Sequence, residues 1–332
     1  MTKTIPLIDV SPLSGGDTEA LAHAAGLIGD AARDFGFFQV VGHDIADDLV
    51  ARIWEETRLF FDQARDAKLA LLRTKENPRG YYDRELTKNA RDLKEVFDYA
   101  AVLHPELPED HPDNSAAVDG SNRWPADLPD FRNTMLEYYS ECERLGLEIL
   151  GALCLDLGLA REALFEHFTP EHTSFVRLNY YPLTDPLDSA EAAQASGLGD
   201  MALHHHTDAG AITILLQDDV GGLQVLSDGD WIDVTPTEGA FVINVGDMMQ
   251  VWSNDQYEAN LHRVRPTKNR ARYSIPCFFN PSYETDYAPL ATGPDDPPHY
   301  RSINWGEFRQ ARTDGDYADF GKEVQIADFR IV

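Results

Sequence analysis

The residues best suited to chemistry in this chain are His206 and Asp208, two positions apart, and His262 further along. In a β-strand, residues i and i+2 point to the same face, so His206 and Asp208 could reach one metal ion from a single strand. The run around His262 reads as a later strand that could bring a third donor from the facing side. Two imidazoles and one carboxylate suit one face of an iron(II) ion and leave three positions open for an organic acid and dioxygen. Zn(II) is the alternative metal, since it also accepts histidine and aspartate.

A second pair with the same spacing is Arg272 and Ser274. A guanidinium presents a planar fork that matches a carboxylate, and a serine hydroxyl adds a further hydrogen bond. If the strand is regular, both side chains share one face. The pair therefore indicates a binding site for a carboxylate.

The strand expected over 173–181 has one unusually polar face. The residues on that face are Phe175, Arg177, Asn179 and Tyr181. Two interpretations stay open: these groups line a pocket, or they bond to one another inside a barrel. Near the metal candidates, His204 shares the face of His206 and could contact the site from outside, whereas His205 points the other way and is expected to be structural or solvated.

The elements that must position these residues change in type near residue 173. Before it, the patterns predict helices over about 17–34, 46–63, 128–157 and 160–168, and strands over 5–9 and 36–42. Residues 74–92 carry turn signals, and 104–129 are expected to form a long irregular excursion. After it, short strands are expected at 173–181, 201–206, 210–217, 222–226, 231–234, 240–244, 248–252, 259–265 and 271–279, with a short helix near 304–313. Many short, closely spaced strands indicate a sandwich or a barrel.

Composition limits the classes of function. The chain has 332 residues, of which 43% are hydrophobic and 26% charged, which suits a globular protein. It contains no apolar run of about 18 residues and no apolar secretion signal at its start, so no membrane span is expected. Three cysteines argue against a disulfide scaffold and favour the cytoplasm. The net charge of −29 disfavours nucleic acid and anionic membranes as partners.

Short motifs along nearly the whole chain resemble those of one enzyme family. They are Ile5-Pro-Leu-Ile-Asp9, Asp34-Phe-Gly-Phe-Phe-Gln-Val-Val-Gly-His43, Arg79-Gly-Tyr81, Lys94-Glu-Val-Phe-Asp98, Asn179-Tyr-Tyr-Pro182, His206-Thr-Asp208, Gly222-Leu-Gln-Val225, Asn244-Val-Gly-Asp247, Trp252-Ser-Asn254, His262-Arg-Val264 and Arg272-Tyr-Ser274. Their order resembles the iron(II)- and 2-oxoglutarate-dependent dioxygenases of the isopenicillin N synthase-like family.

The resemblance implies a mixed α and β fold: a distorted double-stranded β-helix, or jelly-roll, with flanking helices that are mainly N-terminal. It implies one structural unit, made of a helix-rich region at 1–170, the oxygenase core at 171–290 and a C-terminal segment at 291–332. Pro276 departs from a regular strand, because proline donates nothing to a ladder, so we expect a bulge or an edge position there.

The resemblance also implies roles for individual residues. His206, Asp208 and His262 would be the catalytic metal ligands; Arg272 and Ser274 would hold 2-oxoglutarate, with Tyr181 and Asn179 beside it. The implied cofactors are Fe(II), 2-oxoglutarate as cosubstrate, and dioxygen. Candidates for the substrate wall are Phe279, Phe278 and Tyr81.

Three functions follow as hypotheses. The first is a dioxygenase that hydroxylates or desaturates a small molecule and releases succinate and carbon dioxide. The second is an isopenicillin N synthase-type oxidase that uses no 2-oxoglutarate. The third is a catalytically silent binding module on the same fold, which the complete ligand set disfavours. The sequence does not specify the substrate or the oligomeric state.

Overall fold

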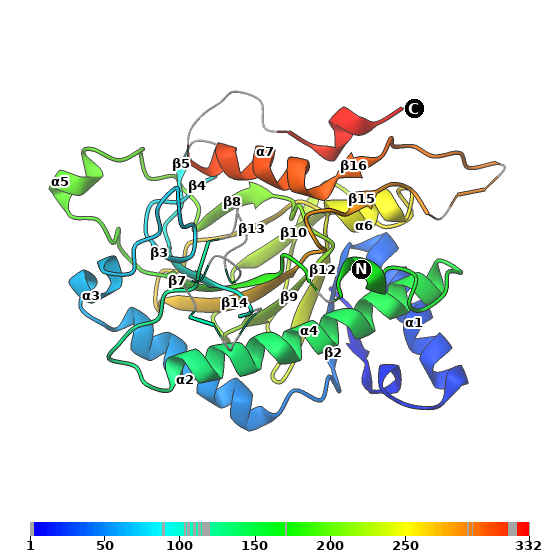
Figure 1. Cartoon of the computed structure of the whole chain (residues 1–332), viewed down its shortest axis with the longest axis horizontal. Helices are drawn as coiled ribbons and strands as arrows, with labels where there is room; N and C mark the ends of the chain where they lie inside the picture. The colour runs from blue at the N-terminus through cyan, green and yellow to red at the C-terminus, as the bar shows by residue number, and fades with distance from the viewer. Residues whose placement is uncertain are drawn as a thin grey trace.

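The computed structural model describes residues 3–87, 90–102, 104, 107–108, 111, 114, 120–169, 171–290, 292–293, 295–317 and 324–331, with backbone only for 313–317. It shows a mixed α and β fold in which helices surround two β-sheets (Figure 1). Among these residues, no helix combines the length and the apolar character needed to cross a bilayer. The three cysteines are buried and unpaired, as their number predicted.

The larger sheet has eight strands and is antiparallel except at one edge, where β1 runs parallel to β2. In spatial order its strands are β1 (Leu7–Asp9), β2 (Phe37–Val41), β12 (Phe241–Val245), β9 (Ile212–Gln217), β14 (Arg272–Phe279), β7 (Phe175–Tyr181), β6 (Glu95–Tyr99) and β3 (Gly80–Tyr82). Neither β3 nor β6 was predicted from the sequence, which carries turn and polar signals around β3.

The smaller sheet has four antiparallel strands, in the order β11 (Asp230–Asp233), β10 (Leu223–Ser227), β13 (His262–Val264) and β8 (Leu203–His206). Two-stranded pairs are formed by β4 (Leu86–Thr87) with β5 (Ala90–Arg91), and by β15 (Asp286–Tyr287) with β16 (Ile303–Asn304). Apolar residues from both main sheets meet in one cluster that includes Phe37, Val242, Leu223 and Val264, so the two sheets face each other.

Helices cover the outer face of the larger sheet. They are α1 (Thr18–Asp34), α2 (Asp47–Phe61) and α4 (Phe131–Asp156); α4 contacts both other helices as well as β9 and β14. Figure 1 shows α2 and α4 along one side of the strands and α7 (Trp305–Tyr317) along the opposite side. The start of α1 is set by Asp17, whose carboxylate accepts hydrogen bonds from the backbone N–H groups of Glu19 and Ala20. These helices confirm the expected ranges within a few residues.

Shorter elements complete the description: η1 (Ser11–Leu13), α3 (Arg65–Leu69), η3 (Phe165–His167), α5 (Ser189–Ala192), α6 (Asp247–Trp252) and η4 (Ile326–Phe329). The helix expected at 160–168 is only the 3-10 turn η3 with turns before it. Of the irregular excursion expected at 104–129, residues 105–106, 109–110, 112–113 and 115–119 lie outside the described residues.

Two expectations about strands are wrong. The strand expected at 248–252 is the helix α6, whose first N–H groups, at Asp247 and Met248, bond to the carbonyls of Asp208 and Gly210. Pro276 causes neither a bulge nor an edge position: β14 is a central strand, its register with β9 runs unbroken through Pro276, and only the ladder with β7 is interrupted there. The missing N–H is therefore tolerated without a shift of register.

Candidate metal centre

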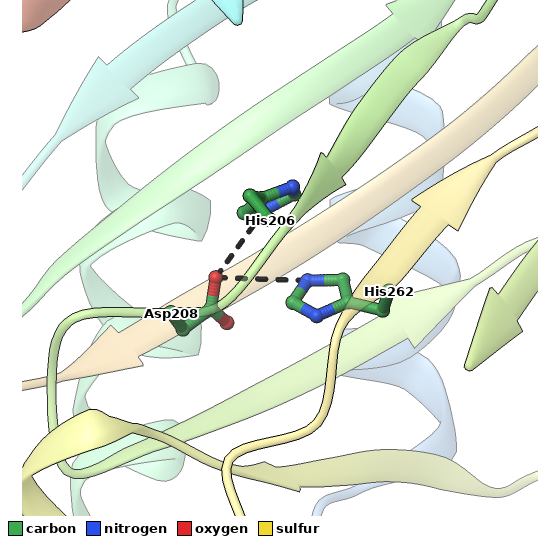
Figure 2. A group of neighbouring side chains, drawn as sticks. All are labelled: His206, Asp208 and His262. Atoms are coloured by element: carbon green, nitrogen blue, oxygen red, sulfur yellow. Dashed lines mark ion pairs between the residues drawn. The ribbon is translucent and has the colours of Figure 1, made fainter. Parts of the chain in front are cut away.

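Three side chains converge between the two sheets (Figure 2). One potential ligand atom from each of His206, Asp208 and His262 lies within 4.8 Å of the others. Asp208 Oδ1 is 3.5 Å from His206 Nε2 and 3.6 Å from His262 Nε2. The two histidines are direct cross-strand neighbours on β8 and β13, and their ring centroids are 4.3 Å apart. Asp208 lies just beyond the end of β8 rather than within it, yet its carboxylate reaches the same point.

The second oxygen of Asp208 is fixed by the larger sheet. Thr213 Oγ1 donates to Asp208 Oδ2 at 2.5 Å, and Asn244 Nδ2 donates to the same atom at 3.0 Å. Thr213 and Asn244 are paired across β9 and β12, so one site in the sheet supplies both donors. This leaves Oδ1 turned toward the imidazoles, in the position of a single-oxygen ligand.

The rings of His206 and His262 are also oriented so that each can offer Nε2 to a metal ion. His206 Nδ1 lies 2.9 Å from the carbonyl oxygen of His204, and His262 Nδ1 lies 3.3 Å from that of Asn260. A carbonyl only accepts, so each Nδ1 carries the proton and each Nε2 keeps a lone pair. Burial, reinforced by His206, lowers the pKa of His262 to about 4. Burial alone would raise the pKa of Asp208, but the charge of the two imidazoles when they are protonated, together with the Thr213 hydroxyl, holds it well below its usual range. A charged carboxylate beside a neutral imidazole is the donor chemistry that a divalent metal requires.

Arg272 provides an independent sign that the site can bind an anion. Its side chain is buried, with 1% of its surface exposed. Nη2 lies 3.4 Å from Gln217 Oε1, and the guanidinium lies 4.9 Å from the Tyr181 ring centroid. Nε and Nη1 have no hydrogen-bond partner among the described residues. A buried cation with two unused donors is costly unless a ligand completes it, so the residues present fit a carboxylate ligand beside the metal site.

A cavity of about 830 Å³ joins the metal candidates to Arg272. Alternate residues of β14 line it, namely Arg272, Ser274, Pro276 and Phe278, as do Phe175, Arg177, Asn179 and Tyr181 of β7. The polar face expected at 173–181 therefore lines a pocket. The alternative interpretation also holds in part, because Arg177 on this face donates a hydrogen bond of 2.7 Å to Asp98.

Two of the three candidates for the substrate wall lie elsewhere. Phe278 lines the cavity and stacks on Phe175, with centroids 4.7 Å apart. Phe279 points to the opposite face of β14, where it is fully buried against Phe168 of the helix-covered core. Tyr81 is also fully buried, and its hydroxyl donates to Glu95 at 2.6 Å. A substrate contact by Phe279 or Tyr81 is not supported by these positions.

The other two histidines of the run lie outside the ligand group. His204 Nδ1 is 2.6 Å from Asp92 Oδ1, and the backbone N–H of His204 donates to the same oxygen at 3.2 Å. The hydrogen bond between the ring and Asp92 is the main cause of the raised pKa of His204. His205 points toward Trp231, at 6.4 Å between centroids.

One wall of the cavity is a buried cluster of charges. Glu85 Oε2 lies 2.7 Å from Lys94 Nζ and 2.9 Å from an Arg177 nitrogen, and Glu85 Oε1 lies 3.0 Å from Arg73. These cations outweigh the effect of burial and hold the pKa of Glu85 well below its usual range. Glu85 is therefore already neutralised by protein groups.

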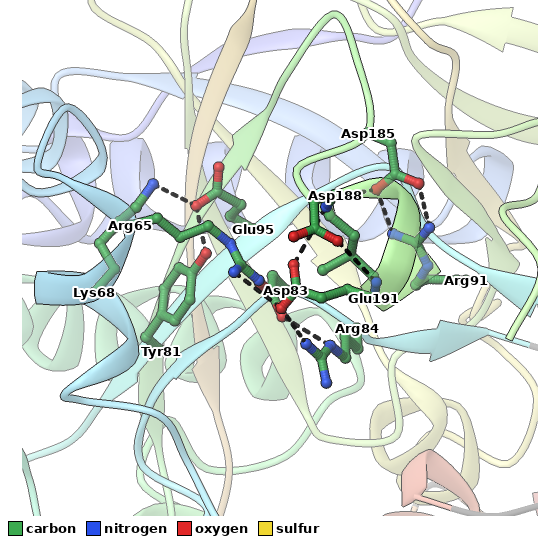
Figure 3. Close-up of polar contacts among 11 residues, drawn as sticks. Arg65, Lys68, Tyr81, Asp83, Arg84, Arg91, Glu95, Asp185, Asp188 and Glu191 are labelled. Carbon is green, nitrogen blue, oxygen red and sulfur yellow. Dashed lines mark hydrogen bonds and ion pairs between the residues drawn. The ribbon is translucent and has the colours of Figure 1, made fainter. Parts of the chain in front are cut away.

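A second set of ion pairs fastens the segment before β8 to the N-terminal half (Figure 3). Arg91 pairs with Asp185, and both Arg65 and Arg84 reach Glu191 Oε1, at 3.0 and 2.9 Å. Arg65 also pairs with the buried Asp83 at 2.6 Å. These ion pairs thus hold the segments near 79–91 and 184–200 against each other.

Three contributors to the site were not predicted from the sequence. Asn244 belongs to one of the motifs that resemble the family, but no role was predicted for it or for Thr213. Their shared face on paired strands is the signal that could have identified them. Arg309 of α7 also lines the cavity, and nothing in the local sequence indicated that α7 would reach it.

Two protein-family models match the chain. The model described as the 2OG-Fe(II) oxygenase superfamily matches residues 172–281. The model described as the N-terminal region of the non-haem dioxygenase in morphine synthesis matches residues 5–127.

Individual proteins are similar over most of their length. The 2-oxoglutarate-Fe(II) type oxidoreductase hxnY of Emericella nidulans is 36% identical over 315 residues, which cover 90% of this chain and 86% of that protein. Homoarginine-6-hydroxylase 2-ODD-C23 of Glycine max is 32% identical, with 87% and 89% covered. A full-length Neurospora crassa protein, crystallised in complex with alpha-KG and thymine, superimposes with a TM-score of 0.75 at 29% identity, covering 91% of this chain and 94% of that one.

Proposed function

The chain belongs to the 2-oxoglutarate–Fe(II) oxygenase superfamily, and from this premise we propose that it uses Fe(II), 2-oxoglutarate and dioxygen to hydroxylate or desaturate a small molecule, with succinate and carbon dioxide as coproducts. The observation that carries the proposal is the pairing, in one cavity, of three converging metal donors with a buried guanidinium whose Nε and Nη1 have no hydrogen-bond partner among the described residues. Iron, when bound, supplies the activation of dioxygen and the oxidative decarboxylation of 2-oxoglutarate.

The residues around the metal have separate tasks in this proposal. His206 and His262 donate through Nε2 and Asp208 through Oδ1. Thr213 and Asn244 keep the other carboxylate oxygen occupied, so that Asp208 contributes a single ligand atom. Three protein donors leave the remaining coordination positions to 2-oxoglutarate and dioxygen.

The residues of β14 and β7 hold the cosubstrate. Arg272 would place its two unused donors on the carboxylate of 2-oxoglutarate that lies away from the metal. Ser274, cross-strand from Asn179, adds a hydroxyl on the same face, and Tyr181 closes the site under the guanidinium. Phe278 offers an apolar surface to the molecule being oxidised.

The wider organisation is part of the same proposal. We infer that the two facing sheets are the double-stranded β-helix of the family, with its core at 171–290, helices at 1–170 and a C-terminal segment at 291–332. The likeness to oxygenase structures and the large antiparallel sheet support this interpretation. A cytoplasmic location, and the absence of nucleic-acid and membrane partners, remain predictions from cysteine content and charge.

The proposal is tested with 2-oxoglutarate labelled at carbon 1. The protein is loaded with Fe(II) without oxygen, exposed to air, and assayed for labelled carbon dioxide and succinate in the presence of candidate substrates. Equal amounts of both products support the proposal. Substrate turnover without labelled carbon dioxide would refute it and favour the oxidase that uses no 2-oxoglutarate. Neither labelled carbon dioxide nor turnover of any substrate would refute it and favour the silent binding module.

A further inference from the structure

Most of the charged side chains that line the cavity have a partner of opposite charge or a role in the proposed function. The inference below concerns the substrate and rests on that proposed function. The metal site accounts for Asp208, and 2-oxoglutarate accounts for Arg272. Glu85 faces Lys94 and Arg177 within 3 Å. Arg312 of α7 donates to the carbonyl of Thr207, so the remaining charged group of the lining is Arg309 of the same helix.

Among the described residues, no acid pairs with Arg309. It lines the cavity, and its guanidinium lies 5.5 Å from the centroid of the Phe175 ring. No described residue forms an ion pair or a hydrogen bond with it. The chain as a whole carries a charge of −29, with 57 acidic residues against 28 basic ones. An arginine that stays unmatched on a cavity wall of such a protein indicates that its counter-ion comes with a ligand.

The position of α7 brings Arg309 close to the reacting centre. Arg312, one turn further along the helix, donates to the carbonyl of Thr207 at 3.3 Å, between two of the metal ligands. Trp305 at the start of α7 donates its indole N–H to Thr173 Oγ1 at 2.8 Å, which fixes the helix against the strand that begins at Phe175. Arg309 lies between these two anchors, so a short molecule held by it lies within the cavity that contains the metal donors.

The surface beside Arg309 is apolar and aromatic. Phe175 and Phe278 stack on each other along the same wall, and Pro276 and Leu86 add further apolar lining. Glu85, the other acid on the cavity wall besides Asp208, is neutralised by three protein cations, so nothing on this wall favours a cationic substrate.

We propose that the molecule oxidised by this enzyme is a small carboxylic acid with an apolar body, whose carboxylate pairs with Arg309 while its body lies against Phe175 and Phe278. The guanidinium fork suits a carboxylate, and the aromatic pair suits an apolar chain or ring. Arg309 then determines specificity without taking part in the metal chemistry.

The test compares acids with their neutral analogues. The wild-type protein with Fe(II) and 2-oxoglutarate, kept free of oxygen, is titrated by calorimetry with hexanoate, phenylacetate and 3-phenylpropanoate, and with the primary amides of the same three acids. Prior titration with 2-oxoglutarate alone checks the proposed function separately, because its failure would appear at that step. At least one acid is expected to bind more tightly than its amide.

Substitutions then assign the preference to one residue. Arg309→Gln is expected to weaken binding of that acid roughly 10- to 150-fold, the range for one hydrogen bond to a charged group, and to leave binding of the amide little changed. Arg309→Lys is expected to restore part of the affinity, since it keeps the charge without the fork. Arg301→Gln, which removes the same charge from an exposed position outside the cavity, is the matched control and should bind as wild type.

Three outcomes would overturn the proposal. They are amides that bind as tightly as the acids, an acid affinity unchanged in Arg309→Gln, and no binding by any of the acids to a protein that does bind 2-oxoglutarate.

Discussion

Replacing Arg272 by methionine should raise the free energy of unfolding of the ligand-free protein and weaken the binding of 2-oxoglutarate. The buried charge destabilises the protein without ligand, whereas it stabilises the complex. Methionine keeps much of the length and the apolar stem and removes the guanidinium. Without ligand, Arg272 has two unused donors, one hydrogen bond of 3.4 Å to Gln217 and the ring of Tyr181. Burial raises the pKa of Asp218, whereas the charge of Arg272 acts to lower it. The Asp218 carboxylate, however, accepts hydrogen bonds from the backbone N–H groups of Tyr273 and Val220 rather than from Arg272.

The magnitudes follow from these contacts. Each unsatisfied buried donor costs about 1–3 kcal/mol, and the cation–π contact returns about 0.5–2 kcal/mol. The variant without ligands should therefore be more stable than wild type by about 1 kcal/mol or more, which corresponds to a rise in Tm of roughly 2 °C. Two charge-assisted hydrogen bonds to 2-oxoglutarate, at about 1.5–3 kcal/mol each, predict an increase in Kd of at least about 100-fold.

The assay is urea unfolding of both proteins, first alone and then with Fe(II) and 2-oxoglutarate in the absence of oxygen. Wild type should gain stability with 2-oxoglutarate and the variant should not. Arg270→Met, which removes an exposed arginine paired with Asp219, is the control. A variant that is less stable than wild type when empty, and that binds 2-oxoglutarate with unchanged Kd, would refute the reasoning.

Three further predictions concern single positions. His262→Ala should lose bound iron, measured by metal analysis after loading and desalting, whereas His205→Ala should keep it; equal iron in the two variants would remove His262 from the ligand set. Phe279→Ala should lower the free energy of unfolding by about 3–5 kcal/mol, because it leaves a void in the core, whereas Phe278→Ala should mainly raise KM for the substrate; the reverse pattern would mean that their faces are exchanged. Tyr81→Phe should cost about 1.5–3 kcal/mol of stability, as expected for the loss of a hydrogen bond to a charged acceptor, with KM unchanged; a raised KM would return Tyr81 to the substrate wall.

The parts of the site that depend on strand geometry could be predicted from the sequence. Alternation along a strand is fixed by the backbone, so the shared face of Arg272 and Ser274, and the polar face at 175–181, follow from spacing alone. The meeting of His206 with His262 was expected only in outline, because their direct pairing depends on the register of two strands far apart in the sequence.

The predictions from the sequence are wrong or incomplete where tertiary contacts determine the local structure. Residues 248–252 are a short apolar run that fits a strand or a buried helix equally well. Two tertiary contacts favour the helix. The carbonyls of Asp208 and Gly210 accept the first N–H groups of α6. Gly246, just before the helix, allows this close approach, because a Cβ there would come within 2.2 Å of the Gly210 carbonyl oxygen. The facing of Phe278 and Phe279 depended on whether Pro276 shifts the register, which neighbouring strands determine. Arg309 could not be placed, because the packing of α7 depends on contacts such as the hydrogen bond from Trp305 to Thr173.

The hydrogen bonds between Asp92 and His204 have a consequence for how the protein behaves in a crowded solution. β8 is the outermost strand of the smaller sheet, and the open side of such a strand is a template on which a strand of another molecule can add. Asp92 occupies the backbone N–H of His204 and binds its ring, while the N–H of Leu93 bonds to the carbonyl of Met201 just before the strand. The segment around Asp92 therefore blocks β8 against intermolecular pairing, so that the strand that carries His206 is protected from self-association.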